Sequence, residues 1–305
     1  MPSSSTLLNP SRPFGSVITA MVTPFTDDGE LDLSAAGAVV EHLLANGHDG
    51  IVVSGTTGEA PTTTDAEKDA LLREVVRVVD GRAQVLAGVG TNDTRHTVEL
   101  AKAAEAAGAD GLLVVTPYYS KPPQAGIVAH FRAVADATGL NVLVYDIPGR
   151  AAVPITTASL IELGEHPRIV AVKDAKGDLF EAATVMSQAG LAYYSGADEL
   201  NLAHLTQGGS GVVSVVGHVA GRAIRRQVDA VAAGDLATAV AVHHEMIPVT
   251  RAMMQVIQGA SSSKAALQYL GVLPNRLLRS PQQPATDAEY QALVAVLDAA
   301  GYRPA

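Results

Sequence analysis

The sequence contains neither cysteine nor tryptophan among its 305 residues. The absence of cysteine excludes disulfide bonds, thiolate nucleophiles, iron–sulfur clusters and cysteine-ligated zinc. The first 15 residues lack the basic start and apolar stretch of a secretory signal. No run of about 18 apolar residues occurs, so no membrane-spanning helix is predicted. We therefore expect a cytoplasmic protein that makes no contact with a membrane.

Charged and aromatic residues are also scarce, at 17% and 4% of the chain. Acidic residues outnumber basic ones by 31 to 21, which gives a formal net charge of −10. Nucleic acids are bound by basic surfaces, so this balance argues against a nucleic-acid partner. The apolar fraction of 48% suffices for a large core, which aliphatic residues must fill because aromatic residues are few.

Short segments rich in valine, isoleucine and leucine recur along the chain, and most are continuously apolar. Such runs are typical of strands buried on both faces of a parallel sheet. The segments are 16–22, 50–55, 84–90, 111–117, 141–146, 169–174, 192–196 and 211–216. Stretches with helical spacing separate them, of which the clearest are 33–45, 65–79 and 94–107.

Eight strands that alternate with helices form either a doubly wound open sheet or a closed barrel. An open dinucleotide-binding sheet would need a glycine-rich loop after the first strand, but residues 20–25 contain no glycine. We therefore predict the α/β class and a (β/α)8 TIM barrel with a C-terminal helical extension. Beyond residue 220 the pattern is helical only, with helices expected at 221–233, 235–257, 262–271 and 286–300.

Three parts are expected from this pattern. They are a flexible N-terminal tail at 1–15, a catalytic barrel at 16–233 and a C-terminal helical domain at 234–305. Reactive groups in such barrels gather on the loops that follow the carboxyl ends of the strands. Polar residues in those loops are therefore the candidates for chemistry.

Lys173 is the sharpest of these candidates. It is one of six lysines and the only one that closes a fully apolar run, 169–172. Burial disfavours the ammonium form and so makes the amine available as a nucleophile toward carbonyl carbons. The same position also suits a lysine that extends to solvent or pairs with Asp174. Position alone leaves the Schiff-base and structural interpretations open.

Other polar groups follow neighbouring strands. The turn GTTGE at 55–59 offers hydroxyls and backbone N–H groups that suit a small carboxylate, but it is also an ordinary turn sequence. Tyr145 ends a strand and is either a proton carrier or a core residue with a satisfied hydroxyl. Arg150 follows a Pro-Gly turn and is either a bidentate carboxylate ligand or a solvated loop residue.

Neither a metal site nor a phosphate loop is predicted. His243, His244 and Glu245 are adjacent, and neighbours on a helix point about 100° apart, so they do not converge on one ion. The glycine-rich stretch at 208–211 precedes the eighth strand and therefore belongs to the face of the barrel opposite the active site. We expect no metal.

Several motifs together resemble the dihydrodipicolinate synthase family, which are class I aldolase-type enzymes on a TIM barrel. The motifs are GTTGE at 55–59, TPYY at 116–119, YDIPGR at 145–150, VKDA at 172–175, SG at 195–196 and GVVSV at 211–215. The likeness extends from about residue 16 to residue 271. It implies condensation of pyruvate with L-aspartate-4-semialdehyde, as a 4-hydroxy-tetrahydrodipicolinate synthase of lysine and diaminopimelate biosynthesis.

The resemblance also implies roles for individual residues. Lys173 would form the Schiff base with pyruvate, so no free cofactor is expected. Thr57 and Tyr145 would relay protons together with Tyr119 of a neighbouring subunit. Tyr118 and Tyr119 would lie at a dimer interface within a homotetramer, a dimer of dimers. The substrate-binding residues would be Thr56, Thr57, Arg150, Gly196 and Val213, with Arg150 receiving the carboxylate of the semialdehyde.

Two other functions compete with this one. A sister aldolase or lyase, acting on a 2-keto-3-deoxy sugar acid or N-acetylneuraminate, would share Lys173 and Tyr145. Arg150 favours the synthase, because a second substrate with a carboxylate needs a guanidinium whereas a sugar chain needs neutral groups. The second competing function is that of a non-catalytic barrel that acts as a binding subunit. Such a protein would not need the complete set of catalytic residues, which this sequence contains.

The resemblance also bears on inhibition by lysine. In lysine-inhibited members, small polar and histidine ligands follow the GTTGE turn and a carboxylate holds the ammonium group. Here Ala60, Pro61, Asp65 and Lys68 occupy those positions, and His96 stands where the carboxylate would be. Lys68 would repel a cationic ligand. We therefore expect little or no inhibition by lysine.

Overall fold

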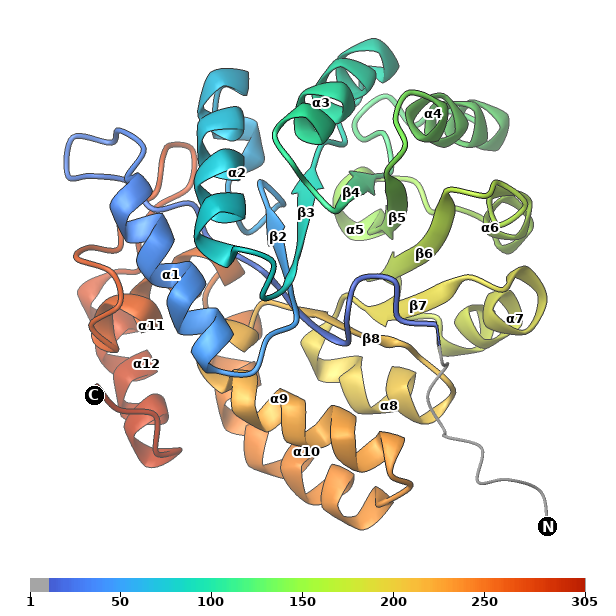
Figure 1. Cartoon of the computed structure of the whole chain (residues 1–305). Coiled ribbons are helices and arrows are strands. Elements are labelled where there is room, and N and C mark those ends of the chain that lie inside the picture. The colour runs from blue at the N-terminus through green and yellow to red at the C-terminus, as the bar shows by residue number, and fades with distance from the viewer. Residues whose placement is uncertain (1–10, 305) are drawn as a thin grey trace.

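The computed structural model describes residues 11–304 and confirms the predicted fold. Eight parallel strands close into a barrel in sequence order, with β8 paired to β1 (Figure 1). The strands are β1 (Val17–Ala20), β2 (Gly50–Val53), β3 (Gln84–Gly88), β4 (Gly111–Val115), β5 (Asn141–Asp146), β6 (Ile169–Asp174), β7 (Ala192–Ser195) and β8 (Gly211–Ser214).

Helices surround the barrel and connect its strands (Figure 1). They are α1 (Leu33–Ala45), η1 (Ala60–Thr62), α2 (Asp65–Val79), α3 (Thr94–Ala106), α4 (Gln124–Asp136), α5 (Pro148–Ala151), α6 (Thr157–Leu163), α7 (Leu179–Ala189), η2 (Asp198–Leu200) and α8 (Asn201–Thr206). The predicted helices at 33–45, 65–79 and 94–107 are confirmed. Thr64 begins α2 with a capping box to Glu67, and Gly81 adopts a positive φ just beyond its end.

Side chains that alternate along each strand fill the inside of the barrel. This inner cluster contains Ile18, Ala20, Val52, Leu86, Leu113, Leu143, Tyr145, Ala171, Ala192, Tyr194 and Val213. Phe14 closes the base, where a Cβ on Gly111 would lie only 2.5 Å from its ring. The Tyr194 hydroxyl donates to the Gly15 carbonyl at 3.0 Å and so ties the entering chain to β7.

The C-terminal helices gather beside β8 and β1 (Figure 1). They are α9 (Gly217–Ala232), α10 (Leu236–Arg251), the π-helical turn η3 (Ala252–Val256), α11 (Gly259–Tyr269) and α12 (Asp287–Ala299). The helical extension is confirmed, but some predicted bounds are wrong. Helix α9 begins at Gly217, where Ser214 Oγ accepts from the Gly217 N–H at 2.8 Å, and it is kinked at Ala220, directly before the predicted start at 221. Helix α11 begins at Gly259 because the Gln258 side chain caps its first N–H groups.

Two predicted boundaries concern the ends of the barrel. Of the expected tail at 1–15, residues 1–10 lie outside the described residues. Phe14 is only 1% exposed, so barrel packing begins before residue 16. The division at 233/234 falls in the turn between α9 and α10, but α9 to α12 share one apolar cluster with β1 and β8. Separate barrel and helical domains therefore stay a prediction.

No helix in the part of the chain that the structure describes is long and apolar enough to cross a membrane.

Candidate active site

Lys173 and Tyr145 end neighbouring strands and face the inside of the barrel. They lie opposite each other in the β5–β6 pairing, and each is only 5% exposed. Lys173 Nζ lies 4.1 Å from the centre of the Tyr145 ring. No carboxylate within residues 11–304 forms an ion pair with it. The structure thus places a buried amine beside a phenol, without a fixed counter-charge.

The two structural interpretations of Lys173 do not fit these contacts. At 5% exposure its side chain does not extend into solvent. Asp174, the next residue, points to the opposite face of the strand because successive side chains alternate. Its Oδ1 accepts from the Lys176 N–H at 2.7 Å instead. These contacts fit an amine that adds to a carbonyl, and that role of Lys173 stays a prediction.

Gly196 lies directly beside the Lys173 side chain. A Cβ built on Gly196 would meet Lys173 Cγ at 2.9 Å and Cε at 3.0 Å. These distances are shorter than ordinary carbon contacts, so any larger residue would displace the lysine. Val213 on β8 is 1% exposed and belongs to the same inner wall. Both predicted lining residues are thus placed at the inner end of the site.

The GTTGE turn follows β2 in a tight and strained conformation. Ser54, which precedes the turn, and Glu59, its last residue, both have φ near +55°, a left-handed conformation that non-glycine residues rarely adopt. The Glu59 N–H donates to the Thr56 carbonyl at 3.1 Å. Thr57 is 6% exposed, whereas Thr56 faces a cavity. The turn therefore holds two threonines close to the barrel mouth.

A cavity of about 450 Å³ opens at the carboxyl end of the strands. Its walls include four of the predicted residues, Thr56, Tyr118, Tyr145 and Arg150. Lys173 adjoins this cavity through the Tyr145 ring, which both residues share as a neighbour. The cavity therefore combines hydroxyl groups, a phenol and a guanidinium close to the buried amine.

Arg150 lies in α5, a single helical turn that Pro148 begins. Its side chain is exposed at the rim of the cavity. Among the described residues it forms no ion pair, unlike most arginines of this protein. A guanidinium without a protein partner at a cavity rim is suited to binding a carboxylate with two parallel hydrogen bonds.

Tyr119 does not join the other predicted catalytic residues within one chain. It is 86% exposed, and its backbone has a φ of +74°. Its neighbour Tyr118 lines the cavity instead. A relay that includes Tyr119 would therefore need a second copy of the chain.

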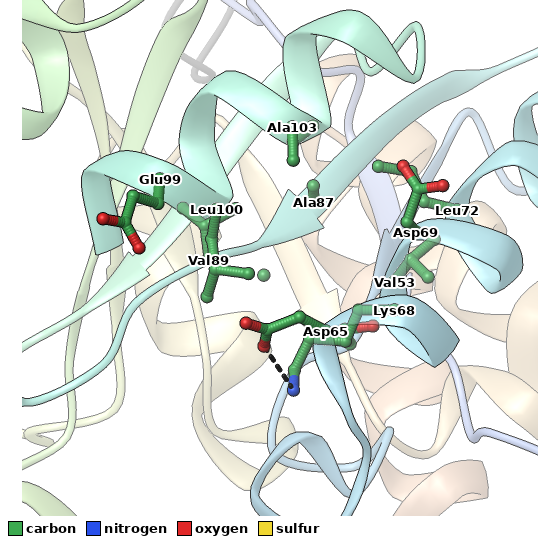
Figure 2. Close-up of a pocket in the computed structure, with 13 residues that line it drawn as sticks. Val53, Asp65, Lys68, Asp69, Leu72, Ala87, Val89, Glu99, Leu100 and Ala103 are labelled. Atoms are coloured by element: carbon green, nitrogen blue, oxygen red, sulfur yellow. Dashed lines mark ion pairs between the residues drawn. The ribbon is translucent and has the colours of Figure 1, made fainter. Parts of the chain in front are cut away.

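A second cavity of about 250 Å³ lies between α2 and α3, beside the first (Figure 2). Its walls are mainly apolar, with Lys68 and Asp65 at its edge, where their charged atoms are 3.7 Å apart (Figure 2). His96 Nε2 also lies 2.8 Å from Asp65. Burial lowers the pKa of Lys68, although the Asp65 carboxylate opposes this effect. The Asp65 carboxylate thus already has two partners, and the two other carboxylates that line this cavity, Asp69 and Glu99, pair with Arg73 and Arg95.

Sequence reasoning missed two residues that support the site. Asp198, which follows β7, accepts from the Val215 and Val216 N–H groups at 2.8 and 3.0 Å and so fixes the end of β8. Lys264 on α11 lies 2.5 Å from Glu59 of the GTTGE turn. The available signal for Lys264 was a charged residue within 259–267, a stretch of otherwise small, apolar and serine residues.

A pair of carboxylates flanks the site on the outer face of the barrel. Asp146 and Asp174 follow Tyr145 and Lys173 directly and lie opposite each other in the β5–β6 pairing. Burial raises the pKa of Asp146 to about 7, although the Ile155 N–H and the Lys176 ammonium act in the opposite direction. Because both side chains point away from the cavity, they influence stability and do not contact the reacting groups.

Within residues 11–304, no three histidine, aspartate or glutamate side chains are arranged to hold a metal ion. The expectation of an enzyme that needs no metal or free cofactor stays a prediction.

Comparison with known proteins gives one family throughout. A profile of the Dihydrodipicolinate synthetase family matches residues 13–300. A 4-hydroxy-tetrahydrodipicolinate synthase of Kineococcus radiotolerans is 58% identical over 301 residues, which cover 99% of this chain and 98% of that protein. A second, from Streptomyces coelicolor, is 54% identical over 292 residues, which cover 96% and 97% of the two chains.

Solved structures agree. A dihydrodipicolinate synthase from Bacillus anthracis is 39% identical, with a TM-score of 0.90 over 93% of this chain and 98% of that one. The enzyme from Cyanidioschyzon merolae, solved with lysine bound, is 40% identical, with a TM-score of 0.92 over 96% and 100% of the two chains. The similarity thus covers both the barrel and the C-terminal helices.

Proposed function

Because this chain belongs to the dihydrodipicolinate synthetase family, we propose that it condenses pyruvate with L-aspartate-4-semialdehyde to form 4-hydroxy-tetrahydrodipicolinate. The family is one of Schiff-base-forming lyases, and the reaction belongs to lysine biosynthesis. The observation that carries the proposal is the buried Lys173 amine, which has a phenol beside it and no carboxylate partner among the described residues.

In the proposed first step, Lys173 Nζ adds to the keto carbon of pyruvate and water leaves, which forms an imine. Thr56 and Thr57 bind the pyruvate carboxylate at the GTTGE turn. Tyr145 and Thr57 carry the proton from the amine to the departing oxygen, in series with Tyr119 of a partner subunit. Gly196 leaves space for the lysine to turn toward the cavity, because any side chain there would occupy that volume.

In the second step, the imine loses a proton from its methyl carbon and becomes an enamine. That carbon then attacks the aldehyde carbon of the second substrate, which forms the new carbon–carbon bond. The amino group of the second substrate adds to the imine carbon and displaces Lys173, so the ring closes and the free amine is regenerated. Arg150 holds the carboxylate of the semialdehyde at the rim of the cavity.

The two alternative functions are not favoured. A sister aldolase for sugar acids would leave the unpaired Arg150 guanidinium at the cavity rim without a carboxylate to bind. A non-catalytic binding subunit would not need an amine as deeply buried as Lys173. The curated relatives described above carry the synthase name over nearly their full lengths.

The function is tested with a coupled assay that contains pyruvate and aspartate semialdehyde, together with borohydride trapping. Borohydride reduces an imine to a stable amine, so pyruvate should add mass to the protein, and the modified peptide should contain Lys173. We expect condensation only when both substrates are present. We expect no activity toward N-acetylneuraminate. Trapping without condensation would instead support a sister aldolase.

The assembly is the part of the proposal that needs a partner. We propose a homotetramer, a dimer of dimers, in which Tyr118 and Tyr119 lie at an interface and Tyr119 enters the neighbouring site. The exposed Tyr119 supports this, because its ring contacts little of its own chain. Mixing inactive Tyr119→Phe and Lys173→Met proteins under subunit exchange should restore activity, since one site per pair regains both groups. No recovery after proven exchange would place Tyr119 in its own site.

A cytoplasmic location stays a prediction from the sequence.

A further inference from the structure

The GTTGE turn is held from outside the barrel by a buried ion pair. Lys264 Nζ of α11 donates to Glu59 Oε1 at 2.5 Å, and both side chains are 1% exposed. The two residues are 205 positions apart. The pair therefore joins the loop after β2 to the C-terminal helices, at the edge of the barrel that carries the candidate active site.

Both members of the pair are fully engaged. Glu59 Oε2 accepts from the Arg279 N–H at 2.9 Å, and Lys264 Nζ also donates to the Leu277 carbonyl at 2.7 Å. The Phe25 ring lies 4.3 Å from Lys264 Nζ and shields the pair from water. Burial lowers the pKa of Lys264 to about 8, although the Glu59 carboxylate acts in the opposite direction. Loss of Lys264 would leave the buried Glu59 carboxylate with only the Arg279 N–H as a hydrogen-bond donor among the described residues.

The same carboxylate belongs to a residue whose backbone is strained. Glu59 has φ of +55° and ψ of +36°, and such conformations persist only where the surroundings enforce them. Its N–H donates to the Thr56 carbonyl, and its own carbonyl accepts from the Thr62 N–H at 3.0 Å. The Thr23 hydroxyl donates to the Gly58 carbonyl at 2.6 Å. Hydrogen bonds thus join Glu59 to the turn that carries the two threonines.

We propose that the C-terminal helices hold the pyruvate-binding turn in its reactive shape through the buried Glu59–Lys264 ion pair. Glu59 and Lys264 are positioning residues: they touch no reacting atom, and they act through Thr56 and Thr57. This inference rests on the proposed function, because it concerns how the turn binds the carboxylate of pyruvate. It assigns the helical extension a part in substrate binding.

The main test measures pyruvate binding in the full-length protein. In Lys264→Met, the pyruvate concentration that gives half-maximal borohydride trapping should rise at least tenfold, with a parallel rise in the KM for pyruvate. The KM for the semialdehyde should change less than threefold, because Arg150 lies on another loop. Lys102→Met, an exposed lysine of α3, is the matched control and should behave as the wild type.

A paired variant separates positioning from a loss of folding. Glu59→Gln/Lys264→Met replaces both charges, and the amide can still accept from the Arg279 N–H, so pyruvate half-saturation should return most of the way to the wild-type value. Glu59→Asp keeps the charge but shortens the side chain by one methylene. It should raise pyruvate half-saturation in a folded protein, and it replaces Lys264→Met if that variant does not melt cooperatively.

The outcomes are separable from those of the proposed function. If the wild type is not trapped with pyruvate at all, the proposed function fails. If the wild type is trapped, and folded Lys264→Met and Glu59→Asp proteins have pyruvate half-saturation within twofold of it, the ion pair is structural only and the inference is overturned. Equal increases in KM for both substrates would also overturn it, because they would indicate general loosening of the site.

Discussion

Two lysines of this protein are buried, and their surroundings differ in one respect. Lys173, at the end of β6, has a phenol ring as its nearest polar neighbour and no carboxylate partner among the described residues. Lys264, on α11, lies against the Glu59 carboxylate and a backbone carbonyl. Both positions exclude water, but only one supplies a counter-charge.

The difference separates a lysine for chemistry from a lysine for structure. An ammonium in an ion pair is held in one position by its partner, so it fixes the elements that it joins. The Lys173 amine has no carboxylate partner among the described residues, so no ion pair holds its Nζ in one position and it is free to form a bond. Burial alone therefore does not identify a nucleophile; the missing partner does.

The largest expected effect is at Lys173. Lys173→Met should abolish condensation and borohydride trapping, because no other lysine ends a barrel strand. Its melting temperature should stay equal or rise, since methionine has a similar length and removes a buried amine that lacks a carboxylate. Lys173→Arg should be equally inactive, because a guanidinium is not deprotonated in proteins. Full trapping on Lys121 or Lys176 in these variants would refute the assignment, and Lys102→Met controls for loss of a lysine.

The reverse pattern of stability is expected at Lys264, where substitution should destabilise the protein in addition to weakening pyruvate binding. Lys264→Met leaves the Glu59 carboxylate buried without its partner, which costs about 3–5 kcal/mol of unfolding free energy. Chemical denaturation of the variant and of Glu59→Gln/Lys264→Met measures this, and the double variant should regain most of the loss. If Lys264→Met were as stable as Lys173→Met, the distinction between the two lysines would not hold.

Arg150 differs from both buried lysines, because its guanidinium is exposed and forms no ion pair among the described residues. Arg150→Ala should raise the KM for the semialdehyde by about 10–150-fold, the value of a charged hydrogen bond of roughly 1.5–3 kcal/mol. The half-saturating pyruvate concentration in trapping should be nearly unchanged. Steady-state kinetics with each substrate varied in turn give both numbers. Equal damage to both would mean that Arg150 supports the site without contacting the second substrate.

A third lysine, Lys176, lies between these two cases, because it has a carboxylate neighbour at a longer distance. Its Nζ lies 3.8 Å from the buried Asp146 carboxylate. Burial raises the pKa of Asp146 from 3.8 to about 7 in the folded protein. The folded state therefore holds this proton more tightly than the unfolded state, and the resulting stability is lost as the pH rises from about 4 through 7. Asp146→Asn should raise the melting temperature most at pH 8 and progressively less toward pH 4. A pH-independent shift would show that Asp146 is already ionised.

The smallest expected effect is that of free lysine on the reaction. An added ammonium group needs a carboxylate, but those near the site are already held: Asp65 by His96 and Lys68, Glu59 by Lys264, and Asp69 and Glu99 by Arg73 and Arg95. Lysine titrated into the coupled assay to tens of millimolar should therefore inhibit little. Half-inhibition below about 1 mM, which corresponds to roughly 4 kcal/mol of binding, would show that another anion completes the site.

Much of the fold could be predicted because its signals are local. The apolar runs and helix caps act over a few residues, so the eight strands and the bounds of α1, α2 and α3 follow from short stretches of sequence. The turn of α9 that precedes the kink at Ala220 could not, because Gly217 and Gly221 have low helix propensity. They are accommodated there because a Cβ on Gly221 would lie 2.4 Å from His48, so only glycine permits this close packing.

The amino-acid sequence by itself determined the barrel and the position of Lys173 at a strand end, because alternation and strand order place those residues without knowledge of distant contacts. Only the tertiary structure decided which buried lysine is free and which is paired. Lys264 and Glu59 meet across 205 residues, and no spacing rule connects positions that far apart. The exposed orientation of Tyr119 was likewise decided by the path of its loop. Which side chains contact each other in a folded chain depends on how helices and strands pack, and this packing is a property of the whole molecule.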